Sequence, residues 1–172
     1  MSENTKINII VAHDKNNGIG YYNNIPWKCK KDMIFFKYKT IGHNKNNAVI
    51  MGKNTWLSIP NKPLKDRENI VISKTLQETN LFKRFDTCNQ ALDFCNSKNY
   101  DEVWIIGGEK IYQEFILSNK VNYIYTTEID DNYTCDVFFP KIPDNFKFIK
   151  SEFLCKLNEK DVSVKIYKNT LR

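Results

Sequence analysis

The sequence lacks the features of membrane-embedded, exported or zinc-binding proteins. No run approaches the roughly twenty apolar residues that a membrane-spanning helix needs, and residues 1–6 lack the basic-then-apolar pattern of a secretion signal. The chain has only two histidines, and its five cysteines are irregularly spaced without a Cys-x-x-Cys pair. We therefore expect a cytoplasmic protein with reduced thiols and no metal site.

The positive charge of the chain is not concentrated anywhere. The formal net charge is +6 and the pI is about 9.0, which suits an acidic partner such as a polyphosphate, a carboxylate or a nucleic acid. The lysines are scattered, however, with no dense basic tract and no recognition helix of the zinc-finger or homeodomain type. A solvated lysine-rich surface explains them more simply, so neither a nucleic acid nor a membrane is an expected partner.

What the sequence does contain is an alternation of strands and helices within 172 residues, a length that suits one domain over residues 1–172. Short apolar runs of β-forming residues predict buried strands, and windows with apolar residues at helical spacing predict helices. The expected strands cover residues 7–12, 48–51, 70–72 and 102–106, and the expected helices cover residues 31–41, 89–97 and 110–117.

The pattern changes after residue 121, where strands follow one another without helices. The last two strands, around residues 146–149 and 162–167, predict an antiparallel hairpin at the edge of the sheet. Residues 16–27, called the lid segment below, are rich in turn formers and predict a long loop over the end of the first strand. The fold class is therefore α/β, with helices flanking a mostly parallel sheet.

Ligands of open α/β sheets collect at the carboxyl ends of the strands, so the residues just after each strand form the candidate site. Gly18-Ile19-Gly20 begins like a dinucleotide fingerprint, but Asn23 replaces the third glycine and Pro26 follows where a helix should run. We therefore reject a Rossmann site at this position.

Three other strand ends carry groups that bind phosphate. Gly107-Gly108 joins a strand to a helix N-terminus, where free amides favour an anion, while residues 52–55 and Ser73-Lys74 add hydroxyls and lysines. Each turn alone is also common in ordinary structure, for packing or at the surface. Together they indicate a ligand with several separated phosphates, and NADPH fits this arrangement better than NADH.

Asp32 and Arg67 each have two interpretations. Asp32 lies in the first turn of a helix, either as a solvated acid that interacts with the helix dipole or as a carboxylate buried among large apolar residues. Arg67 is either a surface turn residue or a bidentate ligand for a substrate carboxylate. The residues alone leave both alternatives open.

These fragments, in this order, resemble dihydrofolate reductase from about residue 7 to residue 167. The match consists of many separated blocks, which makes chance agreement implausible. The blocks are residues 18–20 with 25–27, 32–37, 49–56, 63–70, 105–112, Thr127 and 135–140.

The resemblance implies a mostly parallel eight-stranded sheet and NADPH-dependent reduction of 7,8-dihydrofolate to 5,6,7,8-tetrahydrofolate, which supplies one-carbon carriers for thymidylate and purine synthesis. Asp32 would bind the aminopyrimidine edge of the pterin, with Thr127 assisting and Trp27 ordering a water. Arg67 would hold the glutamate carboxylate. The other substrate contacts that it implies are Ile10, Val11, Ala12, Ile25, Met33, Phe36, Lys37, Ile59, Leu64 and Ile106.

The resemblance also places NADPH along the strand ends. Gly107 and Gly108, joined by a cis peptide, would lie against the pyrophosphate, with Tyr112 near the nicotinamide. The implied phosphate ligands are Lys53, Thr55, Ser73 and Lys74, and the remaining cofactor contacts are Ala12, Ile19, Gly20, Gly52, Asn54, Ile106, Glu109, Lys110 and Ile111.

Two residues depart from the family pattern. Glu109 follows the glycine pair where a small residue is usual, and its carboxylate should repel a pyrophosphate unless it points to solvent. Lys53 stands where arginine is common and offers a point charge instead of a bidentate contact. His13 is expected to be structural, and residues 43–47 form a polar loop without an assigned role.

Two alternatives remain open. A reductase of pteridine or flavin precursors could share the scaffold, although it would not need a clamp such as Arg67. A non-catalytic RNA-binding module would suit the basic pI and would show salt-sensitive RNA binding without oxidation of a pyridine nucleotide. Members of the family also occur fused to thymidylate synthase, so thymidylate synthase is a possible natural partner of this chain.

Overall fold

The computed structural model describes residues 5–172, so most of the segment examined for a secretion signal lies outside the described residues. The strands are β1 (Lys6–Asp14), β2 (Gly18–Gly20), β3 (Ala48–Gly52), β4 (Glu68–Ile72), β5 (Lys83–Phe85), β6 (Glu102–Gly107), β7 (Tyr123–Ile129), β8 (Val137–Phe138), β9 (Phe146–Leu157) and β10 (Lys160–Asn169). The helices are α1 (Lys30–Ile41), α2 (Lys53–Ser58), α3 (Cys88–Lys98) and α4 (Glu109–Leu117).

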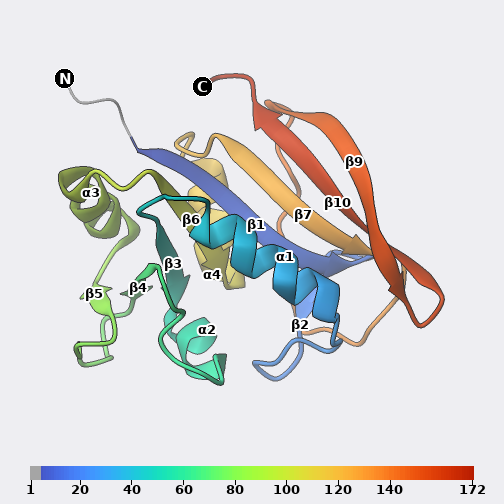
Figure 1. The fold of residues 1–172 in the computed structure, drawn as a ribbon, viewed down its shortest axis with the longest axis horizontal. Helices are drawn as coiled ribbons and strands as arrows, with labels where there is room; N and C mark the ends of the chain where they lie inside the picture. The colour runs from blue at the N-terminus through green and yellow to red at the C-terminus, as the bar shows by residue number, and fades with distance from the viewer. Residues whose placement is uncertain (1–4) are drawn as a thin grey trace.

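Eight strands form one twisted sheet in the order β5-β4-β3-β6-β1-β7-β10-β9 (Figure 1). The neighbours from β5 to β7 are parallel, whereas β10 runs antiparallel to both β7 and β9. This confirms the expected α/β fold with its C-terminal antiparallel hairpin. The ends of β1, β3 and β6 therefore meet at one edge, where a ligand site is expected.

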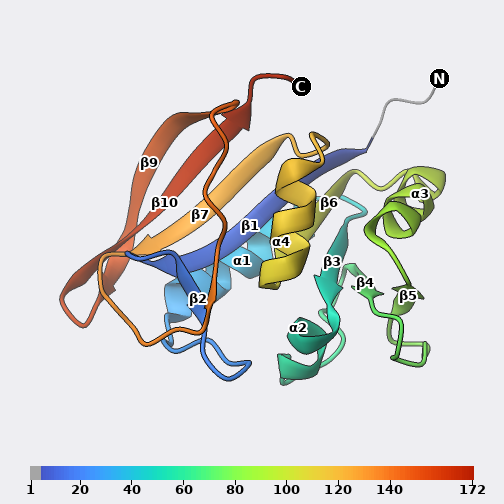
Figure 2. The same cartoon turned by 180° about the vertical axis from the view of Figure 1, so that it is seen from behind.

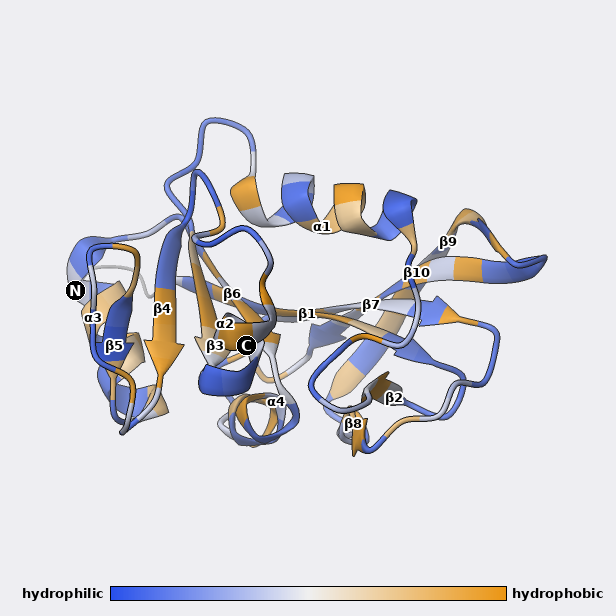
Figure 3. Ribbon diagram, turned by 90° about the horizontal axis from the view of Figure 1, so that it is seen from below, coloured by the Kyte–Doolittle hydropathy of each residue, from blue (hydrophilic) through white to orange (hydrophobic). Residues whose placement is uncertain are grey.

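The helices cover opposite faces of the sheet. Helix α1 lies across one face, and α4 lies on the other, as the two views from front and behind agree (Figures 1 and 2). We call these the α1 face and the α4 face. The same arrangement is visible edge-on, with α1 and α4 on either side of the strands (Figure 3).

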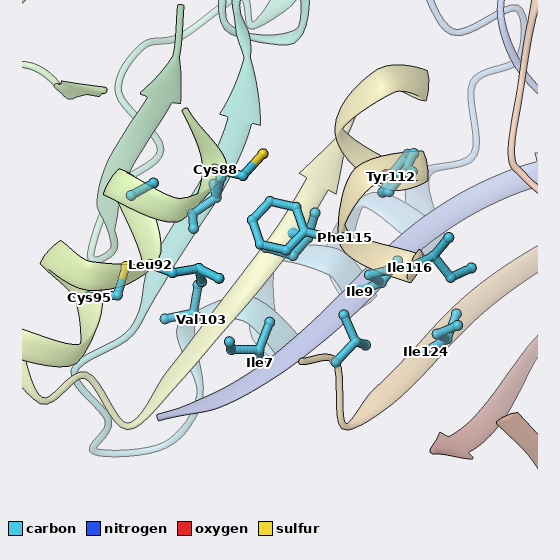
Figure 4. Close-up of a cluster of buried hydrophobic side chains, with 14 of the residues drawn as sticks. Ile7, Ile9, Cys88, Leu92, Cys95, Val103, Tyr112, Phe115, Ile116 and Ile124 are labelled. Atoms are coloured by element: carbon cyan, nitrogen blue, oxygen red, sulfur yellow. The ribbon is translucent and has the colours of Figure 1, made fainter. Parts of the chain in front are cut away.

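Two large apolar clusters hold the layers together. The cluster on the α4 face joins β1 to α3 and α4 through residues such as Ile9, Leu92 and Phe115 (Figure 4). The cluster on the α1 face is built around Met51 and Trp104, which are fully buried. Alternation along β1 divides its side chains between these two clusters, because successive residues in a strand point to opposite faces.

Four short elements were not expected from the sequence. Residues 53–58 form helix α2, and residues 83–85 form the edge strand β5. Within the lid segment, β2 pairs with β8, so part of this predicted loop belongs to a small antiparallel sheet of its own (Figure 3). The lid segment is therefore attached to the distant segment of residues 135–139.

Helix α1 agrees with its predicted bounds but not with its predicted apolar face. Gly42 ends it with a positive φ of 73°, as a C-terminal glycine should. Of its residues only Thr40 is fully buried, and Met33 is 59% exposed. An apolar helix face that remains partly open to solvent is typical of a wall of a binding cleft.

Candidate active site

The carboxylate of Asp32 is partly buried and is bonded to a neighbouring strand. Thr127, on β7 and 1% exposed, donates a hydrogen bond from Oγ1 to Asp32 Oδ1 at 2.6 Å. Burial raises the pKa of Asp32, and the hydrogen bond from Thr127 partly offsets this rise. This contact and this burial favour the interpretation of Asp32 as a buried carboxylate over that of a solvated helix-dipole acid.

Apolar side chains from several elements gather on the α1 face beside this carboxylate. They are partly buried and pack on the cluster around Trp104, so they leave an apolar surface open for a flat ligand. The predicted substrate contacts in this group are Phe36, Ile59, Leu64 and Ile106. Ile10 is 4% exposed in the same cluster, while Met33 and Ile25 extend into solvent.

The prediction for Val11 is wrong as far as its side chain is concerned. Val11 is buried in the cluster on the α4 face, together with Ile9, and so points away from Asp32. Ala12, the next residue, is paired with Thr127 across the β1 and β7 strands. The alternation of a strand puts Ala12 on the side of the sheet that carries the carboxylate.

Arg67 is half-buried and its side chain is held in place from two directions. Its Nε donates to the carbonyl oxygen of Lys65 at 2.8 Å, and one terminal nitrogen donates to Thr40 Oγ1 at 3.0 Å. Burial lowers the pKa of Arg67, and Asp66 partly opposes that effect. A guanidinium oriented in this way retains further N–H groups for a ligand carboxylate.

The glycine turns after β3 and β6 come together at the sheet edge. The peptide between Gly107 and Gly108 is cis, as the resemblance implies. A Cβ on Gly108 would lie 3.6 Å from Thr55 Oγ1, and one on Gly52 would lie 3.2 Å from Ile111. The N-terminus of α4 therefore opens beside Thr55, where a phosphate would meet free amides and a hydroxyl. We call this region the phosphate end of the cleft.

Gly107 and Tyr112 fit closely against each other. Gly107 has a φ of 117°, and a Cβ there would lie 3.1 Å from the Tyr112 ring. The Tyr112 hydroxyl donates to the carbonyl oxygen of Ile10 at 2.9 Å. Burial raises the pKa of Tyr112 far above its ordinary value, and the nearby Asp32 adds to this effect. Tyr112 is therefore a neutral hydrogen-bond donor that joins α4 to β1.

A second group of polar side chains surrounds the end of β4. Lys53 Nζ donates to Thr75 Oγ1 at 3.0 Å, and Ser73 Oγ accepts from the amides of Thr75 and Leu76 at 3.1 Å each. Arg84 donates to the carbonyl oxygen of Ser73 at 2.7 Å. Thr75 and Arg84 were not identified from the sequence, because nothing in their local pattern links them to Lys53.

The other predicted cofactor contacts are placed less tightly. Asn54, Lys74 and Lys110 are exposed. Ile19 packs against the α4-face cluster, and Gly20 lies where a Cβ would be 3.0 Å from Val137. Lys37 is exposed on α1.

The lid segment is fastened at its start by a buried carboxylate. Asp14 is 1% exposed; its Oδ1 accepts the amides of Asn16 at 2.9 Å and Gly18 at 2.8 Å. Its Oδ2 accepts the amide of Tyr133 at 2.9 Å. Asp14 thus joins the end of β1, the start of β2 and the segment that precedes β8, a role that the sequence did not indicate.

Two further carboxylates bind the small sheet of β2 and β8. Tyr22 N–H donates to Asp136 Oδ2 at 3.1 Å, and Asp136 N–H donates to the carbonyl oxygen of Gly20 at 2.9 Å. On the other side, Phe138 N–H donates to Glu109 Oε2 at 2.6 Å. The Glu109 carboxylate is thus bonded to β8 and does not point freely to solvent, so the repulsion of a nearby pyrophosphate stays a prediction.

Trp27 and His13 lie in different surroundings. Trp27 is half-buried against Tyr133, with ring centroids 5.2 Å apart, in a third small cluster that includes Cys29. His13 is buried on the α4 face, with Nδ1 2.6 Å from the carbonyl oxygen of Asp14 and its ring stacked on Phe139. These surroundings support the structural role expected for His13.

One hollow of the described residues does not coincide with this site. It has a volume of about 570 Å³ and lies beside His13 and Glu128, under the segment of residues 139–148. Its lining contains neither Asp32 nor the glycine turns. We assign the chemistry to the open cleft on the α1 face, because the carboxylate, the apolar walls and the phosphate end meet there.

Comparison with known proteins agrees with this geometry. A family model described as dihydrofolate reductase matches residues 6–169. The dihydrofolate reductase of Drosophila melanogaster is 38% identical over 151 residues, which cover 83% of each chain. The chain belongs to the dihydrofolate reductase family. The enzyme of Schistosoma mansoni is 42% identical over 147 residues, 80% of this chain and 79% of the relative.

A longer dihydrofolate reductase relative carries a second activity. The bifunctional dihydrofolate reductase-thymidylate synthase of Paramecium tetraurelia is 36% identical over 141 residues, which are 82% of this chain and 29% of that protein. Within residues 5–172, no helix is long and apolar enough to cross a membrane.

Proposed function

We propose that this chain reduces 7,8-dihydrofolate to 5,6,7,8-tetrahydrofolate with NADPH, and that Asp32 is its central catalytic residue. The observation that carries the proposal is the 2.6 Å contact between Asp32 and Thr127 inside an apolar cleft of a dihydrofolate reductase family fold. The activity itself follows from membership of the family. The role of each residue is our inference from the contacts described above.

Asp32 would hold the pterin by its edge. An aminopyrimidine presents two neighbouring N–H donors, and an ionised carboxylate accepts both in a paired, charge-assisted arrangement. Thr127 donates to Oδ1, which fixes the orientation of the carboxylate and leaves lone pairs on both oxygens for the substrate. Phe36, Ile59 and Leu64 would pack against the substrate, because all three contribute apolar surface to the same cleft.

The reaction needs a proton on a ring nitrogen and a hydride on the neighbouring carbon. NADPH supplies the hydride when it is bound. The negative charge of Asp32 favours the protonated pterin, which is the better hydride acceptor, while water delivers the proton to the nitrogen. The lid segment, fastened at Asp14 and Asp136, would exclude bulk water from this step.

The phosphate end fits the cofactor by its donor set and its open space. The amides at the N-terminus of α4 lie beside Thr55, where no side chain of Gly108 fills the space. Lys53 and Ser73, about the end of β4, would hold a separate phosphate, with Arg84 and Thr75 as additional donors. Arg67 would bind the glutamate carboxylate of the substrate.

The proposal also covers the domain organisation, the location and the partner of the chain. The continuous sheet from β5 to β9 supports a single domain over residues 1–172. Free thiols at all five cysteines support a cytoplasmic location. The match to the bifunctional relative of Paramecium tetraurelia supports a fusion or association of this chain with thymidylate synthase.

The direct test is to mix the purified protein with NADPH and dihydrofolate and to follow the absorbance of NADPH. We expect oxidation of NADPH that needs both substrates and stops when an antifolate is added. Oxidation with a flavin precursor but not with dihydrofolate would replace this function with that of the rival reductase. RNA binding without NADPH oxidation would refute any reductase activity.

A further inference from the structure

Glu109 is the first residue of α4 and occupies an unusual position between two parts of the site. Its backbone belongs to the helix N-terminus at the phosphate end, while its side chain accepts the amide of Phe138 at 2.6 Å. This distance is typical of a strong hydrogen bond to an ionised acceptor. The main chain of Glu109 thus lies at the phosphate end, and its carboxylate is hydrogen-bonded to β8.

The residue that Glu109 binds belongs to the small sheet that carries the lid segment. Phe138 is in β8, which pairs with β2, and its ring is 42% exposed. The Phe138 side chain therefore contributes little burial to hold β8 in place. The hydrogen bond from its amide to Glu109 is a side-chain contact from α4 to this sheet, in addition to the bonds of Asp14 and Asp136.

An anion at the N-terminus of α4 would act on this contact by charge alone. When no anion occupies the phosphate end, the dipole of α4 stabilises the Glu109 carboxylate, because a negative charge in the first turn of a helix is favourable. A cofactor diphosphate at the same amides would repel it, since two like charges within several ångströms raise the free energy of the complex. The carboxylate that holds β8 thus opposes binding of the cofactor diphosphate.

We propose that Glu109 is a positioning residue that fastens the lid segment through Phe138 and weakens the binding of NADPH at the phosphate end. This inference rests on the proposed function, because it takes the phosphate end as the cofactor site. By reciprocity, binding of the cofactor diphosphate weakens the contact from Glu109 to Phe138. With the cofactor bound, the lid segment is held mainly by Asp14 and Asp136. Without it, the hydrogen bond from Phe138 to Glu109 also attaches the lid segment to α4.

Two substitutions separate the charge from the hydrogen bond. Glu109→Gln keeps an oxygen that accepts the Phe138 amide and removes the charge, whereas Glu109→Ala removes both. Glu114→Gln is the matched control, because Glu114 is an exposed acid on the same helix, five positions away from its N-terminus. The dissociation constant of NADPH is measured by tryptophan fluorescence without substrate, so the test does not depend on turnover.

We expect Glu109→Gln to bind NADPH roughly three- to tenfold more tightly than the parent protein at low salt, as removal of one like charge in a partly solvated site predicts. The gain should shrink to less than about twofold near 1 M salt, where the Debye length is about 3 Å. Glu114→Gln should bind as the parent does. Equal or weaker binding by Glu109→Gln at low salt would overturn the proposed effect on the cofactor.

The hold on the lid segment is tested in the cofactor-free protein by amide hydrogen exchange of Phe138. We expect exchange to be roughly tenfold faster in Glu109→Ala, the effect of losing a hydrogen bond to a charged acceptor, and nearly unchanged in Glu109→Gln. The same slow exchange in all three proteins would overturn the role of Glu109 as a fastening. A parent protein that binds no NADPH would refute the proposed function instead, and the exchange experiment would still decide whether Glu109 fastens β8.

Discussion

Thr127 Oγ1 lies 2.6 Å from Asp32 Oδ1, and this contact joins strand β7 to the first turn of α1 across the cleft. Thr127 is fully buried, so its hydroxyl has a fixed partner. The bond stabilises the ionised carboxylate, whereas burial favours its protonated form. The protonation of Asp32 is therefore set by two opposed effects that substitution can separate.

Thr127→Val should raise the pKa of Asp32 further. Valine keeps the volume and removes the donor, so the effect of burial is no longer opposed. The pH at which kcat/KM is half-maximal should therefore move upward. Thr126→Val is the control, because Thr126 is equally buried but points to the opposite face and bonds to Lys165. An unchanged pH profile in Thr127→Val, or an equal shift in the control, would contradict this assignment.

Asp32→Asn should stabilise the ligand-free protein at neutral pH. Because folding raises the pKa of Asp32, ionisation costs stability: the cost is absent below the unfolded pKa of about 3.9 and grows as the pH rises through the folded pKa. Urea unfolding at several pH values should therefore show a gain for Asp32→Asn near pH 7 that disappears near pH 4. A variant less stable than its parent at pH 7 would show that the carboxylate is not desolvated.

Asp14→Asn should destabilise the fold. Three backbone amides donate to this buried carboxylate, and an asparagine presents an NH₂ group to at least one of them. We expect a loss of about 2–3 kcal/mol in the free energy of unfolding. Asp161→Asn is the control, since the side chain of Asp161 makes an exposed ion pair with Lys156 and its substitution should cost less than about 1 kcal/mol. Equal effects of the two substitutions would refute the anchoring role of Asp14.

Arg67→Lys should weaken substrate binding with little effect on the chemical step. Lysine lacks the planar fork that binds a carboxylate at two points, so KM for dihydrofolate should rise roughly tenfold with kcat within about twofold. Steady-state kinetics with dihydrofolate measure this change. Arg172→Lys, at the exposed end of the chain, should behave as the parent does. A loss confined to kcat would mean that Arg67 acts on the reaction and not on the glutamate carboxylate.

The sequence predicted the sheet because its strands are apolar runs that carry their own signal. Residues 48–51 are buried on both faces, and they were identified from composition alone. The short elements escaped detection for the opposite reason. Strand β2 has three residues and β8 has two, and their pairing depends on a partner more than a hundred positions away. No local pattern encodes such a contact.

The site shows the same division between local and long-range information. Asp32 was identified with its two interpretations, and only the position of Thr127 from another strand decided between them. Arg84 and Asp14 were missed because their roles depend on partners brought together by the fold. The family resemblance misplaces Val11, because strand alternation directs its side chain to the α4 face.

The central claim is that the Asp32 carboxylate favours the protonated pterin. The most direct measurement is the rate of hydride transfer in a single turnover, followed by NADPH absorbance after rapid mixing with dihydrofolate. We predict that Asp32→Asn lowers this rate by roughly 10²–10⁴-fold at neutral pH, and that the loss becomes smaller as the pH falls and the substrate is protonated by the solvent. A variant that transfers hydride at the rate of its parent would contradict the account.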